Sequence, residues 1–303
     1  MKGVLLSVLI VVLGVTCANG NDGKQSTATS ENTDTADYII TGLTPENKKF
    51  VESLFANVAK QAKPGDADVP ILFARQFLGL PYVAHTLDKT DDERMVILPR
   101  QLDCTTFVEN VTALTICFNN GKTSFDDYVR QMTDIRYRQG KVGYEQRLHY
   151  YQWWVEDNEA MGFVKEIDSP VPPFTGKQKL KINYMSNNFN SYDMLRHHPE
   201  RVKALLKIEN ATNGKVVKYI PKSETANNKE LREVVHNGDI IAIVTSKTDL
   251  DTSHLGIAVW HDDGLHMIHA SMKYKKVIED PLLLHNYLAG FKTHLGVRIA
   301  KIL

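Results

Sequence analysis

The sequence lacks an excess of charge of either sign. Lys and Arg together number 36, as do Asp and Glu, so the formal net charge at pH 7 is zero. Proteins that bind nucleic acid through the phosphate backbone usually carry a marked excess of Lys and Arg. We therefore expect no nucleic-acid partner. The 303 residues, 43% of them hydrophobic, are enough for one sizeable core or two modest ones.

Long hydrophobic runs are also lacking. The apolar run at residues 4–15, which follows Lys2, is shorter than the ~20 residues that a membrane-spanning helix needs. Its length is typical of the core of an export signal. We therefore expect residues 1–20 to be a signal peptide and the protein to be exported to the periplasm. Residues 21–37, rich in Ser, Thr and Asn, are expected to form a disordered tether.

Two ways of cleaving the leader remain open. Ala18-Asn19-Gly20 resembles an ordinary signal-peptidase site, whereas Gly14-Val15-Thr16-Cys17 is a loose version of the lipoprotein motif. We favour lipidation at Cys17, because this cysteine has no other apparent role. Membrane contact would then occur only through the lipid anchor.

Cysteine is scarce, and beyond the leader only Cys104 and Cys117 occur. A good N-cap, Asp103, precedes a helical pattern of apolar residues at 107, 111, 114 and 118. Helix geometry places the two sulfurs ~20 Å apart, too far for a disulfide. Cys117 is expected to fill space in the core. Cys104 opens the helix, where the unpaired N–H groups and the helix dipole favour a thiolate, so we expect a lowered pKa and a candidate nucleophile.

A histidine-bearing hairpin supplies possible partners for this thiol. The strand from His254 to Trp260 is followed by a turn and a second strand that begins at Leu265. If Trp260 pairs with Leu265, His269 is the diagonal neighbour of His254 on the same face of the sheet, ~7–8 Å away. His266 then points through the opposite face. A thiol, a base and a group that orients the base form a complete set for nucleophilic catalysis.

Zinc is the alternative use of these histidines. A zinc site needs three or four converging ligands, and strand parity leaves only His254 and His269 on one face. The HExxH helix of many zinc hydrolases is also absent from the sequence. We therefore expect no metal and no cofactor.

Five segments in order resemble the motifs of the NlpC-type cell-wall cysteine peptidases. They are FLGLPY at 77–82, LDCTTFV at 102–108, GDII at 238–241, HLGIAV at 254–259 and IHAS at 268–271. The resemblance implies an α+β, papain-like fold in which the nucleophile helix packs on a small antiparallel β-sheet. It also implies that Cys104, His254 and His269 are catalytic.

Departures from the usual motifs narrow this resemblance. Thr105-Thr106 stands in place of Ser-Gly, Val83-Ala84-His85 in place of glycines, and about 120 residues separate the nucleophile helix from Gly238. With DCTTFVEN at 103–110 and RLHY at 147–150, the chain is similar to an N-acetylmuramoyl-L-alanine amidase-like branch. This similarity implies cleavage between N-acetylmuramic acid and L-alanine in peptidoglycan or soluble muropeptides. A γ-D-glutamyl-diamino acid endopeptidase and an inactive peptidoglycan-binding module remain the alternatives.

The long insertion, at about 138–236 of a catalytic domain spanning 38–303, mixes aromatic residues with arginines. Such residues can stack on sugars and pair with carboxylates, although a satellite core is the alternative. We expect substrate contacts from Arg147, Tyr150 and Trp154, and from Ser253 beside the catalytic strand. Tyr82, together with the Cys104 N–H, is expected to stabilise the oxyanion. A monomer is expected.

The periodicity also predicts the regular elements. Helices are expected at 45–61, 70–78, 104–118, 125–138 and 282–288, and strands at 239–245, 254–260, 265–270, 276–278 and 294–302.

Overall fold

The computed structural model describes residues 38–169 and 172–303, and residues 38–303 belong to one folded unit. The expected signal peptide, tether and acylation site at Cys17 lie outside the described residues. Among the helices of the described part, none has the length and hydrophobicity to span a bilayer.

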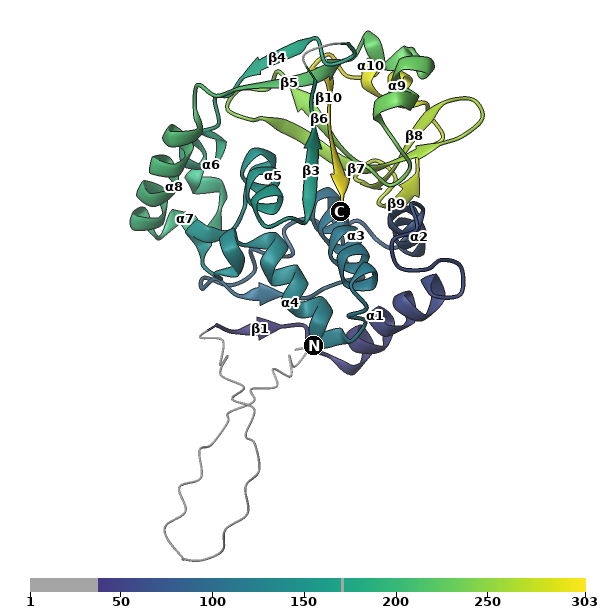
Figure 1. The fold of residues 1–303 in the computed structure, drawn as a ribbon. Coiled ribbons are helices and arrows are strands. Elements are labelled where there is room, and N and C mark those ends of the chain that lie inside the picture. The colour runs from purple at the N-terminus through teal and green to yellow at the C-terminus, as the bar shows by residue number, and fades with distance from the viewer. Residues whose placement is uncertain (1–37, 170–171) are drawn as a thin grey trace, which may run out of the picture. The chain divides into compact units, whose positions relative to one another are not determined.

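The centre of the fold is an eight-stranded antiparallel sheet, so the protein is mixed α+β (Figure 1). The strand order is β4-β5-β10-β6-β7-β8-β9. The eighth strand, β3, pairs with the C-terminal half of β10, on the same side of β10 as β5. The strands are β3 (Val164–Ile167), β4 (Gly176–Lys179), β5 (Val216–Pro221), β6 (Ile240–Thr245), β7 (Thr252–Trp260), β8 (Leu265–Ser271), β9 (Lys276–Glu279) and β10 (His294–Ile302).

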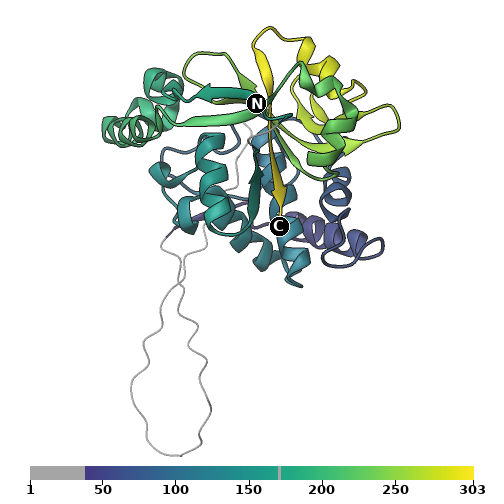
Figure 2. The ribbon, with the colours of Figure 1, turned by 45° about the horizontal axis from the view of Figure 1, so that its top comes forward.

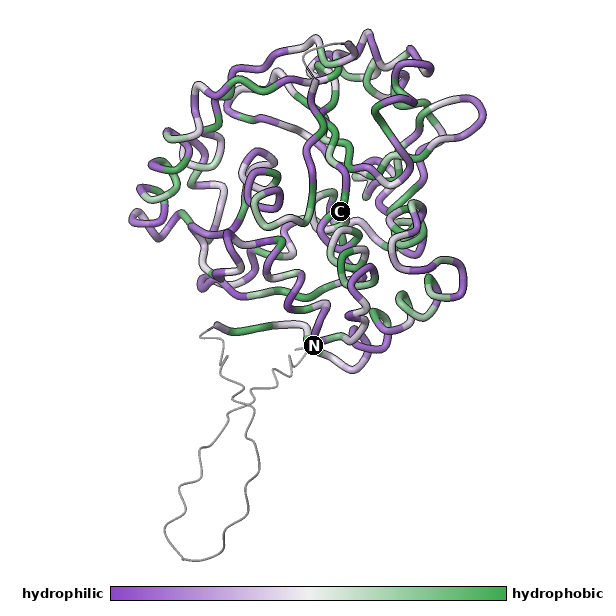
Figure 3. The backbone as a smooth tube through the Cα atoms, viewed as in Figure 1, coloured by the Kyte–Doolittle hydropathy of each residue, from purple (hydrophilic) through white to green (hydrophobic). Residues whose placement is uncertain are grey.

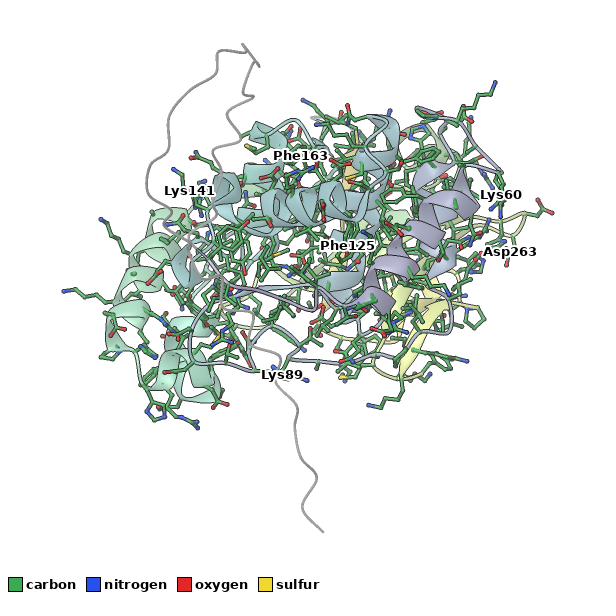
Figure 4. All side chains as sticks on the ribbon, turned by 90° about the horizontal axis from the view of Figure 1, so that it is seen from below. Lys60, Lys89, Phe125, Lys141, Phe163 and Asp263 are labelled. Atoms are coloured by element: carbon green, nitrogen blue, oxygen red, sulfur yellow. The ribbon has the colours of Figure 1, made fainter. Side chains whose placement is uncertain are left out.

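Helices surround this sheet, and Figure 1 shows α1, α3 and α4 grouped on one side of the strands. The helices are α1 (Pro45–Val58), α2 (Val69–Gln76), α3 (Cys104–Asn119), α4 (Phe125–Arg136), α5 (Tyr151–Ala160), α6 (Tyr184–Asn187), α7 (Asp193–Arg196), α8 (Pro199–Thr212), α9 (Asn228–Val234) and α10 (Leu284–Ala289). A short parallel pair, β1 (Ile40–Thr41) and β2 (Met95–Val96), lies apart from the main sheet. Figure 4 shows this helical side with Phe125 labelled at the start of α4.

The helix expected to begin at Cys104 is confirmed as α3. The Asp103 side chain accepts a hydrogen bond from the Thr106 N–H, and the Thr106 hydroxyl accepts one from the Asp103 N–H. This reciprocal capping satisfies two backbone donors and fixes the first turn. Every residue from Thr106 to Phe118 is buried, so α3 is the central helix of the larger core. Figure 3 shows hydrophobic segments along α3 and the central strands.

The predicted pairing of the histidine hairpin is also confirmed. Trp260 pairs with Leu265, and Ile257 with Ile268, in the antiparallel ladder of β7 and β8. Between β6 and β7 the register shifts beside His254, which leaves Ser253 without a partner in the β6 ladder. Such bulges bend a strand and re-aim neighbouring side chains. Register and bulge together determine where His254 points.

The two faces of β7 pack differently. Leu255 and Ile257 share the larger core with α3, whereas Gly256 lies on the other face. A Cβ at Gly256 would lie 2.4 Å from the Met267 Cγ, so glycine is needed here for close packing.

The insertion is more integrated than the sequence suggested. Its strands β3, β4 and β5 join the main sheet, which is therefore larger than the small sheet expected. Its helices α5 to α9 were not predicted. Both Figure 1 and Figure 2 show α8 at the periphery of the molecule, whereas α5 contributes buried residues to the larger core.

Candidate active site

Cys104 lies at the N-terminus of α3 and is half-buried. Its sulfur interacts with the Leu255 backbone N–H and with the Thr105 hydroxyl. The first contact brings the thiol to β7, one residue from His254. Cys104 and Cys117 are both free, and Cys117 is buried in the core as expected.

The lowered pKa expected for the Cys104 thiol is wrong. Burial, together with the neighbouring Asp103 charge, raises the pKa of its thiol to about 12. Hydrogen bonds from backbone N–H groups and Thr105 lower the pKa, but the cost of desolvating a thiolate is larger. The resting group is therefore a neutral thiol, which needs a base to remove its proton.

The side chains of His254, His269 and Asp280 form a hydrogen-bonded chain. The Nε2 of His254 lies 2.6 Å from the Nδ1 of His269, and the Nε2 of His269 lies 3.1 Å from the Oδ2 of Asp280. The Asp280 carboxylate only accepts, so the proton of neutral His269 is on Nε2 and its Nδ1 is an acceptor. His254 then donates from Nε2, which leaves its Nδ1 unprotonated and able to take a proton from a thiol.

The electrostatics agree with these roles. Burial lowers the pKa of His254 to about 3, helped by the charges of His269 and His294, so His254 is neutral near pH 7. Burial would raise the pKa of Asp280, but hydrogen bonds from His269 and the Leu282 N–H outweigh it and the pKa is lowered. Asp280 is therefore a stable carboxylate that orients His269.

Sequence reasoning missed Asp280 and Tyr287. Asp280 follows directly after β9, whose pairing of Ile278 with His269 places residue 280 one diagonal step away. Extending the predicted strand by two residues would have found it. Tyr287, on α10, stacks on His254 with ring centroids 6.2 Å apart and meets His269 edge-on at 5.5 Å. Nothing in the sequence of α10 indicates that contact.

His266 takes no part in the hydrogen-bonded chain of His254, His269 and Asp280, as its strand parity predicted. Its Nδ1 lies 3.0 Å from the Asp280 backbone oxygen and its Nε2 lies 3.1 Å from the Asp263 carboxylate. Its ring packs against His261. His266 therefore provides a nearby histidine that is buried but separate from His254.

Two cavities meet at Cys104. The first, which we call the His254 cavity, has a volume of about 150 Å³ and is lined by Cys104, His254 and Ser253 among others. The second, the Tyr82 cavity, has a volume of about 340 Å³. They share the lining residues Cys104, Thr105, Leu148, His149, Tyr150 and Leu250. The thiol therefore lies where two adjoining hollows meet.

Tyr82 and Cys104 line the same cavity. Burial raises the pKa of Tyr82, and the neighbouring Cys104 and Asp103 raise it further. Tyr82 is thus a neutral phenol and can donate a hydrogen bond.

The residues expected to contact substrate divide into two pairs. Arg147 is buried in ion pairs with Asp88 and Glu93, and the Tyr150 hydroxyl donates to Glu209 at 2.7 Å. These two therefore stabilise the insertion, although both line the Tyr82 cavity. Trp154 and Ser253 line the His254 cavity, and the buried Nε1 of Trp154 and Oγ of Ser253 have no hydrogen-bond partner within residues 38–169 and 172–303.

Metal ligands do not cluster in the part of the chain that the structure describes. Among residues 38–169 and 172–303, no group of three or more His, Cys, Asp and Glu side chains is arranged to hold a metal ion.

Solved structures and a family profile show what the chain is similar to. A protein from Bacteroides fragilis described as a xylanase is 37% identical, covering 76% of this chain and 98% of its own, with a TM-score of 0.71. An N-acetylmuramoyl-L-alanine amidase from Bacteroides uniformis is 36% identical, covering 76% and 96%, with a TM-score of 0.70. A Legionella pneumophila protein, 21% identical with a TM-score of 0.63, shares the fold. No curated protein matches significantly.

The profile of the N-acetylmuramoyl-L-alanine amidase-like family matches residues 72–293. This range contains Cys104, His254, His269 and Asp280, and it covers more than half of the chain. The chain therefore belongs to the N-acetylmuramoyl-L-alanine amidase-like family.

Proposed function

We propose that the protein is a cysteine amidase of the NlpC type, with a papain-like core, that cleaves between N-acetylmuramic acid and L-alanine in peptidoglycan or soluble muropeptides. The observation that carries the proposal is the hydrogen-bonded chain from His254 through His269 to Asp280, beside the Cys104 thiol at the N-terminus of α3. Family membership supports the choice of bond.

The chemistry follows from the protonation states. His254 Nδ1 takes the Cys104 proton as the sulfur attacks the amide carbonyl, and the Cys104 N–H with the Tyr82 hydroxyl stabilises the oxyanion. The resulting imidazolium gives its proton to the leaving amine as the carbon–nitrogen bond breaks. Water then hydrolyses the thioester, with His254 as base, and restores the thiol.

Two alternatives are open to experiment. A γ-D-glutamyl-diamino acid endopeptidase would use the same groups on a bond further along the peptide. An inactive binding module would have no need for the ordered histidine–histidine–aspartate chain, because binding requires no proton transfer. We therefore favour an enzyme.

Digestion of a defined disaccharide tetrapeptide, with the fragments identified by mass spectrometry, tests the proposal. We expect the intact disaccharide and the free tetrapeptide. A disaccharide dipeptide and a free dipeptide would establish the endopeptidase, and an unchanged substrate would favour the binding module.

Export and a lipid at Cys17 are also proposed, on sequence grounds alone. Metabolic labelling with a fatty-acid analogue is expected to mark the wild type and not Cys17→Ala. Equal labelling of the two proteins, or no labelling of the wild type, would contradict the anchor.

A further inference from the structure

A third hollow, about 360 Å³ in volume, opens beside the catalytic cavities and is strongly basic. Four of its lining residues are lysines: Lys177 and Lys179 on β4, Lys181 after it, and Lys247 after β6. All four are exposed. We call it the lysine hollow.

The charges of this hollow are mostly unbalanced. Its single carboxylate, Asp249, lies 3.4 Å from the Lys181 ammonium and accepts a hydrogen bond from Asn187. Lys177, Lys179 and Lys247 form no ion pair within the described residues. A chain with a formal net charge of zero thus concentrates positive charge in one concave place. Such a concentration attracts anionic groups.

The hollow adjoins the active site. Leu250 lines the lysine hollow, the His254 cavity and the Tyr82 cavity. Gln178 on β4 donates to the backbone oxygens of Asp251 and Thr245, at 3.0 and 3.3 Å. The wall that carries the lysines is therefore bonded to the segment that leads into β7.

Proton transfer determines which part of a substrate lies on this side. The leaving amine must take its proton from His254, which lines the His254 cavity but not the Tyr82 cavity. The oxyanion must lie near Tyr82, which lines only the Tyr82 cavity. The acyl part therefore occupies the Tyr82 side, and the peptide released as the amine extends across the His254 cavity toward Leu250.

Some buried donors along that path have no hydrogen-bond partner among the residues that the structure describes. The Nε1 of Trp154 and the Oγ of Ser253 lie unpaired in the wall of the His254 cavity, as does the Tyr151 hydroxyl. Trp154 is 3% exposed. Buried polar groups normally have partners, so these donors point to a ligand with hydrogen-bond acceptors, such as peptide carbonyls.

The distance along the strands fits a short peptide. His254 pairs with Ile243 on β6, and Lys247 lies four residues further along the same chain. Lys247 lies two residues beyond the end of β6. Four residues of chain span at most about 13 Å, which is about the length of an extended tetrapeptide. The far end of a bound tetrapeptide would thus reach the lysines, whereas that of a dipeptide would not.

We propose that the lysine hollow is a carboxylate-binding subsite, which holds the anionic far end of the peptide part of the substrate and selects longer peptides. This inference rests on the proposed function for the identity of the substrate. The hollow, its unpaired lysines and its position beside the catalytic cavities are independent of that identity.

The kinetic test compares a disaccharide tetrapeptide with a disaccharide dipeptide. We expect the wild type to prefer the tetrapeptide, and the double variant Lys179→Gln/Lys247→Gln to lose roughly tenfold of that preference in kcat/KM through a higher KM, as for two exposed charge contacts. The preference of the wild type, but not of the variant, should weaken as salt is added. Lys60→Gln is the matched control, because Lys60 projects into solvent (Figure 4) and lines none of the three hollows.

A second measurement separates the subsite from the proposed function. The free tetrapeptide is titrated calorimetrically into the wild type, the double variant and Lys60→Gln. We expect a roughly tenfold weaker Kd in the double variant alone. If the wild type cuts a different bond or none, the proposed function fails while this titration still decides the subsite. An unchanged Kd, or an unchanged preference between the two substrates, would overturn the subsite.

Discussion

The Nε2 of His254 lies 2.6 Å from the Nδ1 of His269, and the two rings are nearly perpendicular, at 88°. A single hydrogen bond thus joins the two imidazoles, and Asp280 determines its direction. This relationship makes the histidines unequal, because His254 exchanges the proton and His269 orients it.

The first prediction concerns this inequality. Cys104→Ala and His254→Ala should abolish turnover of a muropeptide, whereas His269→Ala should retain a small residual activity because an orienting group matters less than a nucleophile or base. His266→Ala removes a histidine outside this hydrogen-bonded chain and should leave turnover nearly unchanged. Thermal melting serves to confirm that each variant is folded. If His266→Ala were more damaging than His269→Ala in a folded protein, the assigned roles would be wrong.

The second prediction concerns Asp280. In Asp280→Asn the side-chain amide can donate to His269 Nε2, which favours the wrong tautomer of both imidazoles. We expect kcat to fall by about 10²–10⁴-fold with little change in KM. Asp263→Asn is the matched control, since Asp263 contacts His266 instead. A loss of less than threefold in Asp280→Asn would show that the carboxylate does not determine the tautomers.

The third prediction concerns the substrate-free thiol. Because burial raises the pKa of Cys104 to about 12, alkylation by iodoacetamide should be slow at pH 6 and should keep increasing through the alkaline range. Labelled peptides quantified by mass spectrometry at several pH values give the profile. A rate that is already constant from pH 6 upward would instead indicate a thiolate and support the acidity inferred from the helix terminus.

The fourth prediction concerns stability in acid. Burial lowers the pKa of His149 to about 3, with Arg147 contributing, while an unfolded histidine titrates near 6.5. Between these values the unfolded chain binds the additional proton, so the stability that neutral His149 provides is present above pH 6.5 and is lost as the pH falls toward 3. The free energy of unfolding should therefore fall less from pH 7 to pH 5 in His149→Gln than in the wild type.

That difference should be of the order of 1 kcal/mol, measured by urea denaturation at both pH values. The comparison of slopes cancels any pH-independent cost of losing the hydrogen bond between His149 and the Tyr144 backbone oxygen. Parallel slopes in the two proteins would contradict the lowered pKa.

The hairpin could be predicted from the sequence because alternation and turn residues determine an antiparallel register. One pairing, Trp260 with Leu265, was enough to place His254 and His269 together. The N-cap Asp103 likewise predicted the start of α3, because capping is a local interaction.

The remaining features depend on tertiary contacts that no local pattern encodes. The burial that raises the pKa of Cys104 and the stacking of Tyr287 on His254 both arise only when α3 and α10 pack on the sheet. Arg147 was expected to bind substrate, but its partner Asp88 lies 59 residues away in sequence and contacts it only in the folded chain.

The central claim is that Cys104, without a metal, cleaves the bond between N-acetylmuramic acid and L-alanine. The most direct measurement is product analysis of a disaccharide tetrapeptide with the wild type and Cys104→Ala, each with and without EDTA. We predict that the wild type releases the disaccharide and the free tetrapeptide equally well in both conditions, and that Cys104→Ala releases neither. Loss of wild-type activity in EDTA, or product formation by Cys104→Ala, would contradict the account.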